Sequence, residues 1–334
     1  MGTGLRWGFL GASRIGRMSL APAMVAAGQT LHAIAARDLS RAQSFGAEFG
    51  FAKAYGGYDA LLEDPAVDAV YVALTNDRHL PWVVRALAAG KDVLCEKPLA
   101  MDAGEVAQIV HAEQASGRRV SEAFGYRYNH QILRLDEIMA KGLLGEVVAA
   151  QVTFGNLIRT VDFRWSAELG GGAMYDIGCY CVDLLRRAIG TEPRTASAVQ
   201  RLQGGVDLST AGQLNFPGDV LAQFVCSFSS ARRQQLTILG TEALLSLDWP
   251  FAPRQDLVSL RIDHAVETFG PSDPYRAMVE AFVAAVQTGG PMPSGTANAL
   301  PQAHAMDAVF AAARTGQVVP VIDATGDRSI LDAS

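Results

Sequence analysis

The sequence predicts an α/β protein in which a doubly wound parallel Rossmann sheet precedes an α+β domain with a large open, mainly antiparallel sheet. Short apolar segments alternate with helical segments through residues 1–124, and most of those helices stop at a glycine. After about residue 145, strand-like segments follow one another across turns. At 334 residues the chain exceeds a common single-domain size. We expect one domain over residues 1–124 and a second domain over residues 125–334, whose C-terminal helix packs back on the first domain.

In the first domain the apolar runs are short enough to be buried strands, and the longer periodic segments between them read as helices. The expected strands are residues 5–10, 30–36, 52–55, 69–74, 92–96 and 120–124. The expected helices are residues 15–27, 40–49, 58–62, 80–89 and 103–116. Strands that alternate with helices in this way pair in parallel, with helices on both faces of the sheet.

The second domain is expected to be an antiparallel meander with a few helices, because its strands are joined by short turns such as Phe216-Pro217-Gly218-Asp219. The expected strands are residues 147–154, 195–202, 212–216, 220–228, 235–239, 243–247 and 257–262. Helices are expected between Met174 and Ala188 and over residues 275–287 and 299–315.

Composition excludes several classes of protein. Hydrophobic residues make up 49% of the chain and charged residues 19%, which allows real cores and excludes disorder. Lys and Arg number 28 against 34 Asp and Glu, a net charge of −6 without a basic cluster, so no nucleic-acid partner is expected. No apolar run reaches the roughly 18 residues of a membrane span. The amino terminus lacks a secretion signal, and the four cysteines lack disulfide density, so a cytoplasmic protein is expected. Histidine and cysteine spacing predicts no metal site.

A nucleotide fingerprint follows the first expected strand. The turn reads Gly11-Ala12-Ser13-Arg14-Ile15-Gly16, which fits G-x-G-x-x-G with serine at the second glycine. Gly11 permits the tight turn, Gly16 lets the helix sit close to the strand, and the amides at the helix start would hold a pyrophosphate. The alternative is a helix start in an α/β protein that binds no nucleotide.

The end of the second expected strand favours NADP over NAD. An NAD site usually places an acid there to accept from the ribose hydroxyls. This chain has Ala35-Ala36-Arg37-Asp38 and then Arg41, and paired guanidinium groups suit a 2′-phosphate. NAD remains the alternative because of Asp38, and both arginines could be solvated surface charges.

Cys95-Glu96-Lys97-Pro98, downstream of this fingerprint, resembles the E-K-P signature of the glucose-fructose oxidoreductase/inositol dehydrogenase (Gfo/Idh/MocA) family. Further segments are similar to the family in the same order. They are Thr75-Asn76 with His79, Glu122-Ala123-Phe124 with Tyr126-Arg127, and Gly170-Gly171-Gly172 leading to Asp176, Gly178 and Tyr180. Tyr180 and the arginines after Ala36 are similar to the dimeric dihydrodiol dehydrogenase and NADP-dependent D-xylose dehydrogenase branch. The resemblance implies that Thr75, Asn76, His79, Glu96 and Lys97 join residues 11–16, Arg37 and Arg41 in binding the cofactor.

Hydride transfer between a carbinol carbon and nicotinamide also requires a side chain that carries a proton. Tyr180 is the candidate, although an ordinary phenol has a pKa of about 10. A nearby cation favours the phenolate, and Lys97 would supply one. Asp176 lies one helical turn before Tyr180 and would bind substrate hydroxyls or position Lys97. The alternatives are an ordinary surface role for Lys97 and simple packing for Tyr180.

For the substrate, Arg127, Phe154 and Trp165 are further candidates beside Asp176 and Tyr180. Arg127 could instead form a structural salt bridge, Phe154 could pack in the core, and His79 could satisfy its local loop. The expected activity is an NADP-dependent dehydrogenase or reductase acting on CH–OH groups, most simply oxidation of an aldose to a lactone. Alternatives are oxidation of a trans-dihydrodiol, reduction of a keto-sugar such as 1,5-anhydrofructose, or a non-catalytic dinucleotide-binding regulator. Since relatives dimerise through the open sheet, a homodimer is expected.

Overall fold

The computed structural model describes residues 4–159, 162–251 and 257–322. The chain divides into two compact units, each of which is described by itself. The first unit consists of Met1–Gly125 and Asp273–Ala299, and the second of Tyr126–Ser272 and Leu300–Ser334. The sequence placed residues 125–334 together, whereas the segment that contains α8 (Pro274–Thr288) clusters with the first unit. Most of the last helix, α9 (Thr296–Thr315), lies in the second unit.

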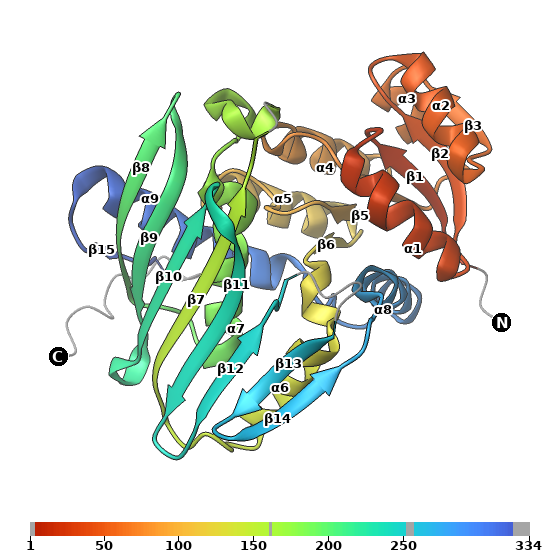
Figure 1. Cartoon of the computed structure of the whole chain (residues 1–334). Coiled ribbons are helices and arrows are strands. Elements are labelled where there is room, and N and C mark those ends of the chain that lie inside the picture. Colours follow the sequence, from red (N-terminus) through yellow and green to blue (C-terminus); the bar gives the residue numbers. More distant parts are fainter. Residues whose placement is uncertain (1–3, 160–161, 252–256, 323–334) are drawn as a thin grey trace. The chain divides into compact units, whose positions relative to one another are not determined.

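The first unit contains a six-stranded parallel sheet in the order β3-β2-β1-β4-β5-β6, which confirms the predicted Rossmann sheet (Figure 1). Its strands are β1 (Arg6–Leu10), β2 (Thr30–Ala35), β3 (Lys53–Tyr55), β4 (Ala69–Val72), β5 (Asp92–Cys95) and β6 (Val120–Glu122). Its first helices are α1 (Ala21–Ala26), α2 (Leu39–Phe49), α3 (Tyr58–Leu62), α4 (His79–Ala88) and α5 (Ala103–Ser116). The strand order reverses between β1 and β4, and open α/β sheets bind ligands at such a point.

Local sequence explains where these elements begin and end. Four of the five residues of β1, and every residue of β4 and β5, are buried, as the continuous apolar runs predict. Asp102 caps α5 by accepting the Glu105 backbone N–H at 2.8 Å, and Gly117 ends that helix in the left-handed conformation. The helix predicted over residues 15–27 differs in its first turn, which is the π-helical segment η1 (Gly16–Leu20) ahead of α1.

The segment from the carboxyl-terminal half of the chain completes the core of the first unit. Phe282 on α8 packs against Trp7 of β1, with ring centroids 5.2 Å apart. The Arg119 guanidinium donates to the Ala285 carbonyl at 2.7 Å and also to the Gly290 carbonyl. Glu122 of β6 donates its backbone N–H to the Ser294 carbonyl at 2.8 Å. These contacts make the segment an integral part of this unit.

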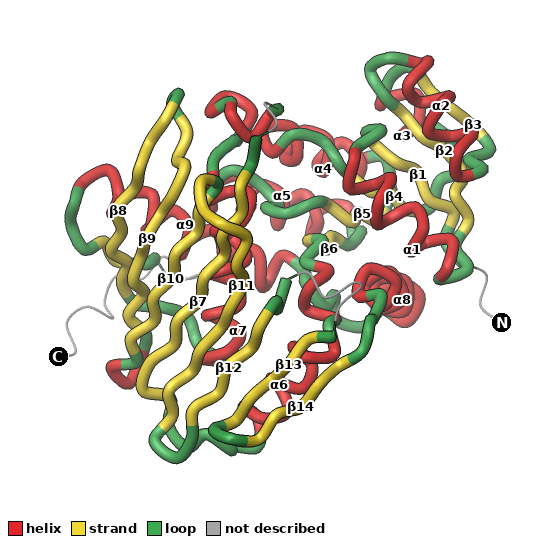
Figure 2. The backbone as a smooth tube through the Cα atoms, viewed as in Figure 1, coloured by secondary structure: helices red, strands yellow, loops and turns green. Residues whose placement is uncertain are grey.

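The second unit contains a nine-stranded mixed sheet in the order β14-β13-β12-β11-β7-β10-β9-β8-β15 (Figure 2). This confirms a large, mainly antiparallel sheet but shows that the expected simple meander is wrong, because β7 lies between β10 and β11 and pairs with β10 in parallel. The strands are β7 (Val147–Leu157), β8 (Thr195–Gln203), β9 (Val206–Asn215), β10 (Leu221–Ser227), β11 (Ser229–Gly240), β12 (Leu244–Asp248), β13 (Val258–Ile262), β14 (Ala265–Phe269) and β15 (Val319–Pro320).

One face of this sheet is covered by helices. The π-helical segment η6 (Met174–Gly178) continues into α7 (Cys179–Ile189), which packs against β7 and β10. The helix α6 (His130–Ala140) packs against α7 and β13. Buried side chains such as Val152, Phe224 and Ile238 fill the space between sheet and helices. Among the helices of the described residues, none is long and apolar enough to cross a membrane.

Candidate functional site

The turn after β1 has the geometry of a close backbone approach. Gly11 has φ +108°, and a Cβ there would lie 2.6 Å from the Ala73 carbonyl oxygen. The Ser13 hydroxyl accepts the Gly16 backbone N–H at 2.9 Å, so the serine that replaces the second glycine is part of the turn itself. Its own O–H remains a donor for a phosphate oxygen. Ala12, Arg14 and Ile15 complete the turn, with Arg14 exposed.

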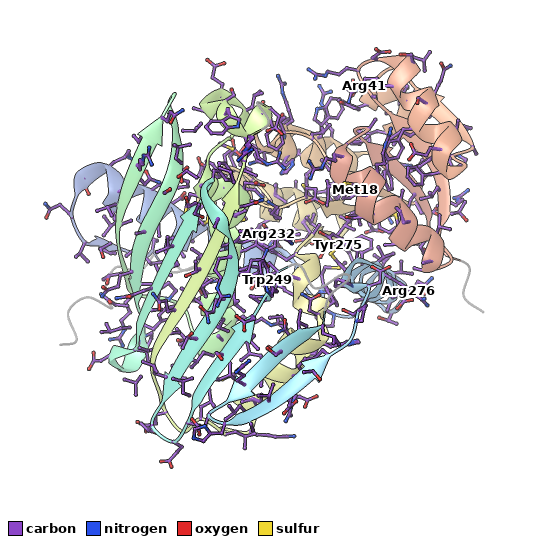
Figure 3. All side chains as sticks on the ribbon, viewed as in Figure 1. Met18, Arg41, Arg232, Trp249, Tyr275 and Arg276 are labelled. Carbon is purple, nitrogen blue, oxygen red and sulfur yellow. The ribbon has the colours of Figure 1, made fainter. Side chains whose placement is uncertain are left out.

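After β2, the Asp38 carboxylate is hydrogen-bonded within the protein and is not positioned as an acceptor for the ribose hydroxyls. The carboxylate caps α2, accepting the Ser40 backbone N–H and the Ser40 hydroxyl at 2.8 Å each. The hydroxyl and backbone bonds from Ser40 hold the pKa of Asp38 below its usual value. Arg37 and Arg41 are both exposed, and Arg41 donates to the Ala12 carbonyl at 3.3 Å (Figure 3). A guanidinium therefore lies beside the phosphate turn.

A third arginine, not predicted from the sequence, belongs to the same region. Tyr58 at the start of α3 has a raised pKa because it is partly buried, and the charges of Arg37, Arg41 and Arg78 oppose that rise. Arg78 comes from the short helix η2 (Asn76–Arg78) after β4 and is paired with Asp77 at 3.0 Å. The three arginines give this edge of the sheet a positive potential, which suits a phosphate.

His79 holds two loops of the sheet edge together. It is fully buried, its Nδ1–H donates to the Pro98 carbonyl at 2.7 Å, and its Nε2 lies 3.3 Å from the Leu74 carbonyl. Burial lowers the pKa of His79. The contacts match the local structural role that the sequence left open. The neighbouring Thr75 hydroxyl donates to Asp77 at 2.5 Å, and Asn76 is also buried.

The Glu96-Lys97-Pro98 segment follows β5 and is held by hydrogen bonds on both sides of Lys97. The Tyr71 hydroxyl donates to Glu96 Oε1 at 2.6 Å, and Glu96 is buried. Three residues after Glu96, the Leu99 backbone N–H donates to Glu122 Oε1 at 2.9 Å. Lys97 itself is partly exposed between these anchors, and the Lys97–Pro98 peptide is cis. The first unit thus presents an ammonium from rigid backbone at the ligand-binding edge of the sheet.

In the second unit, glycines are required in the turn before η6. Gly172 has φ +114°, and a Cβ there would lie 2.2 Å from Asp207 Oδ1. A Cβ on Gly171 would lie 2.5 Å from the Arg164 carbonyl oxygen. The other oxygen of Asp207 accepts the Met174 backbone N–H at 2.9 Å and the Thr210 hydroxyl at 2.7 Å. Asp207, which was not predicted, therefore caps the helix that carries Asp176 and Tyr180, and burial raises its pKa.

Asp176 lies within the π-helical segment and is paired with an arginine. Arg164 Nε donates to Asp176 Oδ2 at 2.8 Å, and Arg164 Nη1 donates to Asp162 at 2.7 Å. Arg164 precedes Trp165 in the 3₁₀ helix η4 (Phe163–Trp165), and the sequence did not identify it as a site residue. Its guanidinium fixes the direction of the Asp176 carboxylate.

Tyr180 belongs to an aromatic cluster formed by Tyr126, Phe154, Tyr180 and Phe251. The rings of Phe154 and Phe251 are stacked, with centroids 4.9 Å apart and planes 10° apart. The Tyr180 ring lies 5.3 Å from Phe251, 5.5 Å from Tyr126 and 5.8 Å from Phe154. Tyr180 is only partly buried, so its ring is held by neighbours without being sealed in the core. The structure therefore brings two predicted site residues, Phe154 and Tyr180, together.

Arg127 and Trp165 lie in different surroundings. Arg127 is buried and pairs with fully buried Asp183, which also accepts the Tyr126 hydroxyl. Burial alone would raise the pKa of Asp183, but the charge and hydrogen bonds of Arg127 hold it below its usual value. This contact matches the salt-bridge alternative for Arg127. Trp165 is partly exposed, 6.3 Å from the ring of Phe228.

The predicted site residues thus fall into two groups. Residues of the phosphate turn, Arg37, Arg41, the His79 loop and Lys97 belong to the first unit, and Asp176, Tyr180, Phe154, Trp165 and Arg127 belong to the second. In the described part of the chain, no group of His, Cys, Asp and Glu side chains could hold a metal ion. The side chains of the two groups provide phosphate donors, an ammonium, a phenol and a carboxylate.

Comparison with known proteins finds matches along most of the chain. Residues 5–124 match the family described as GFO_IDH_MocA, an oxidoreductase family with an NAD-binding Rossmann fold, and residues 132–246 match the GFO/IDH/MocA C-terminal domain. The chain is 34% identical to a D-xylose 1-dehydrogenase (NADP(+)) of Haloferax volcanii over 324 residues, covering 94% of this chain and 99% of that protein. It is 34% identical to the trans-1,2-dihydrobenzene-1,2-diol dehydrogenase of Mus musculus over 259 residues, covering 76% and 78%.

Among solved structures, the chain is similar to KijD10, a 3-ketoreductase from Actinomadura kijaniata in complex with NADP and TDP-benzene. The two are 29% identical with a TM-score of 0.86, and the match covers 92% of this chain and 98% of the other. Solved forms of that ketoreductase include one with a tyrosine replaced by phenylalanine and others with a lysine replaced by alanine or glutamate.

Proposed function

Because the chain belongs to the GFO/IDH/MocA family of oxidoreductases with an NAD(P)-binding Rossmann domain, we propose that it transfers a hydride between NADP and a secondary hydroxyl carbon of a cyclic polyol. The leading reaction is oxidation of an aldopyranose at its anomeric carbon to a lactone. The observation that carries the proposal is the presence of both a constrained lysine on the ligand-binding edge of the Rossmann sheet and a partly exposed tyrosine on a capped helix. A protein that only binds dinucleotide needs neither group.

The preference for NADP rests on what Asp38 and the arginines do. The Asp38 carboxylate is occupied as the cap of α2, so the acid that a ribose diol would need is engaged elsewhere. Arg37 and Arg41 are exposed beside the phosphate turn and would bind a 2′-phosphate through charge-assisted hydrogen bonds. Arg78 adds to the same positive potential. The xylose dehydrogenase relative is named for NADP, and the ketoreductase structure contains it.

For the chemistry, we assign Lys97 and Tyr180 to the proton and Asp176 to a supporting role. The bound nicotinamide supplies the hydride acceptor or donor. The Tyr180 phenolate takes the proton from the substrate hydroxyl during oxidation and becomes the phenol, and the Lys97 ammonium favours the phenolate that this step requires. Asp176, oriented by Arg164, accepts from neighbouring substrate hydroxyls. The proposal requires Lys97 and Tyr180 to reach the same nicotinamide.

The surroundings of Tyr180 favour a ring-shaped substrate. Phe154 packs edge-to-face against Tyr180, and the C–H face of a pyranose would pack well on this aromatic surface. Trp165 follows Arg164, the partner of Asp176, and would contribute a second apolar wall, while Arg127 supports the cluster through Asp183. A trans-dihydrodiol or a keto-sugar would use the same residues, so these remain the alternative substrates. The dihydrodiol dehydrogenase and 3-ketoreductase names of relatives correspond to these alternatives.

We also propose that two copies associate through the outward face of the nine-stranded sheet. Apart from Arg201 at one end of β8 and Arg233 at one end of β11, the paired outward positions on β8, β9, β10, β7 and β11 carry no charged side chain. They are Thr195, Ser197, Val199, Ala211, Gln213, Asn215, Leu221, Gln223, Val225, Ala149, Gln151, Thr153, Gln235, Thr237 and Leu239. Val199 is 70% exposed and Val225 40% exposed. A soluble monomer rarely leaves so large a face with so few charges exposed to water. We therefore expect this face of the sheet to be buried against the same face of a second copy of the chain.

The test is an activity assay with a defined panel. Purified protein is mixed with NADP and a series of pentoses, hexoses and trans-dihydrodiols, and NADPH formation is followed near 340 nm. The reverse reaction is tested with NADPH and keto-sugars. Turnover of a pyranose supports the leading reaction, and turnover of only a dihydrodiol or keto-sugar supports an alternative. Tight NADP binding without turnover on any member of the panel would show that the protein is a regulator.

A further inference from the structure

The turn that follows β12 has an unusual backbone. It runs from Asp248 to Phe251, and Trp249 within it has φ +57°, a conformation that a bulky side chain rarely adopts. The Arg232 guanidinium lies 5.0 Å from the centroid of the Trp249 ring (Figure 3). Backbone of this kind persists only where its surroundings hold it in place, and it is common near functional sites.

Buried amide side chains hold this turn from two neighbouring elements. Asn129, just before α6, donates its Nδ2–H to the Pro250 carbonyl at 2.7 Å. Gln131 donates to the Asp248 carbonyl at 2.9 Å. From β11, Gln234 accepts the Phe251 backbone N–H through its side chain and the Trp249 backbone N–H through its carbonyl, each at 3.1 Å. Asn129 and Gln131 are fully buried, and Gln234 is 2% exposed.

The result of this bonding is a fixed position for Phe251. Its ring is in the aromatic cluster, stacked on Phe154 and 5.3 Å from Tyr180. Its distance from Tyr126 is 5.1 Å, so Phe251, like Tyr180, contacts every other member of the cluster. A shift of the turn would therefore move the surface against which the Tyr180 ring packs. Buried amides are costly unless hydrogen-bonded, so packing alone gives no reason to place them here.

We propose that Asn129 and Phe251 are positioning residues for Tyr180: Asn129 fixes the turn through the Pro250 carbonyl, and Phe251 transmits that position to the phenol ring. This inference rests on the proposed function, in which Tyr180 carries the proton. A displacement of a reacting group by about 1 Å can cost about 100-fold in rate, so a residue that acts only by contact has a measurable effect. Asn129 itself need not touch substrate.

The experiment separates position from activity. Protein labelled with 3-fluorotyrosine gives fluorine NMR signals from its eight tyrosines, and the Tyr180→Phe variant identifies the Tyr180 signal. The variants are Asn129→Ala, Phe251→Leu and Phe251→Tyr, which keeps an aromatic ring. The matched control is Arg134→Gln, also on α6, whose ion pairs with Glu137 and Glu267 lie away from the turn. Each variant is also measured for melting temperature and for kcat and KM with the best polyol of the panel.

We expect Asn129→Ala and Phe251→Leu to move the Tyr180 signal and to lower kcat about ten-fold, with KM for NADP unchanged. Phe251→Tyr should retain kcat within about three-fold, and Arg134→Gln should leave both the signal and kcat unchanged. An unmoved Tyr180 signal in folded Asn129→Ala, or a moved signal with wild-type kcat, would overturn the inference. If Asn129→Ala does not fold, the two Phe251 variants decide. If the wild-type protein has no turnover, the proposed function fails, and the signal alone decides whether Asn129 positions Tyr180.

Discussion

The carboxylate of Asp38 is bonded to Ser40 twice, through the backbone N–H and through the hydroxyl, at 2.8 Å in each case. The acid that follows β2 in the sequence therefore caps helix α2. In a site for NAD, the equivalent acid accepts from the ribose. The sequence Arg37-Asp38 alone is compatible with either NAD or NADP. Because Asp38 is engaged as a helix cap, we expect the cofactor to be NADP.

Replacing Arg37 with alanine is expected to weaken NADP binding at least about ten-fold, because a charge-assisted bond to phosphate is lost. Binding of NAD, which lacks the 2′-phosphate, should change little. Titration calorimetry with both dinucleotides measures the difference. Arg276→Ala, an exposed arginine on α8 paired with Glu280, is the control. Equal weakening of NAD and NADP would show that Arg37 does not recognise the 2′-phosphate.

Substitutions Tyr180→Phe and Lys97→Met are each expected to lower kcat by about 100-fold or more, the usual range for loss of a proton carrier. NADP affinity should be retained in Tyr180→Phe, since the phosphate-binding groups are on the Rossmann unit. Steady-state kinetics and fluorescence titration measure the two effects separately. A Tyr180→Phe variant with full activity would remove the phenol from the mechanism.

Gly172→Ala is expected to destabilise the protein by about 1–3 kcal/mol, because φ +114° is unfavourable for alanine and the new Cβ would meet Asp207 Oδ1 at 2.2 Å. The carboxylate must move, which disturbs the cap of the helix that carries Tyr180. Chemical denaturation gives the free energy of unfolding. Gly270→Ala is the matched control, since nothing lies within 4 Å of its added Cβ. Equal stability of the two variants would contradict the assigned role of Gly172.

The pH dependence of stability should reflect Asp64 in the first unit. Burial alone would raise its pKa, but hydrogen bonds from Lys53, the Ala66 backbone N–H and Tyr55 hold the pKa well below the usual value. A carboxyl with a lowered folded pKa stabilises the protein above its unfolded pKa of about 3.9, and this contribution is lost as the pH falls further.

Asp64→Asn is therefore expected to lower the free energy of unfolding at neutral pH by about 2 kcal/mol, because charged hydrogen bonds are lost. It should also flatten the loss of stability between about pH 5 and pH 3. Urea denaturation across this range measures both effects. Asp59→Asn, an exposed acid paired with Arg85, should behave like the wild type. A steep acid transition retained in Asp64→Asn would assign that transition to other carboxyl groups.

If the outward sheet face joins two copies, Val225→Asp should produce monomers, because a charge would be buried without a partner. Val225 is at an outward position of β10, between Ala211 of β9 and Thr153 of β7. Light scattering coupled to gel filtration gives the mass of each variant. Val25→Asp, an exposed valine on α1 of the first unit, is the control. A dimer that survives Val225→Asp uses another surface.

Local pattern was sufficient to predict the Rossmann sheet. Its central strands are short apolar runs bounded by glycine or helix, and the strand order is consistent with right-handed parallel crossovers. The second sheet was harder, because β7 pairs with strands that come more than 60 residues later and only tertiary contacts determine that position. The helix α6 was missed although Ile132, Leu135 and Ile138 have helical spacing, and this pattern could have revealed it.

The same distinction applies to the candidate site. The turn of residues 11–16 and the Gly170-Gly171-Gly172 segment have signatures in a single short stretch. Asp207, Arg164 and Asn129 have none, because each acts on a residue that is distant in the chain: Asp207 caps Met174 from 33 positions away, and Asn129 is 121 positions from Pro250. Sequence spacing predicts groups that share a local element, whereas partners contributed by separate strands require the folded structure.

The return of Asp273–Ala299 to the first unit has a consequence for biosynthesis. Trp7 does not meet Phe282, nor Arg119 its carbonyl acceptors, until the ribosome has translated more than four fifths of the chain. The nucleotide-binding unit thus stays unfinished while strands β7 to β14 of the second sheet are synthesised, and a nascent chain cannot mature in simple amino-to-carboxyl order. A gene fragment that stops after β6 should yield an unstable product, whereas fusing residues 273–299 to it should restore a folded unit.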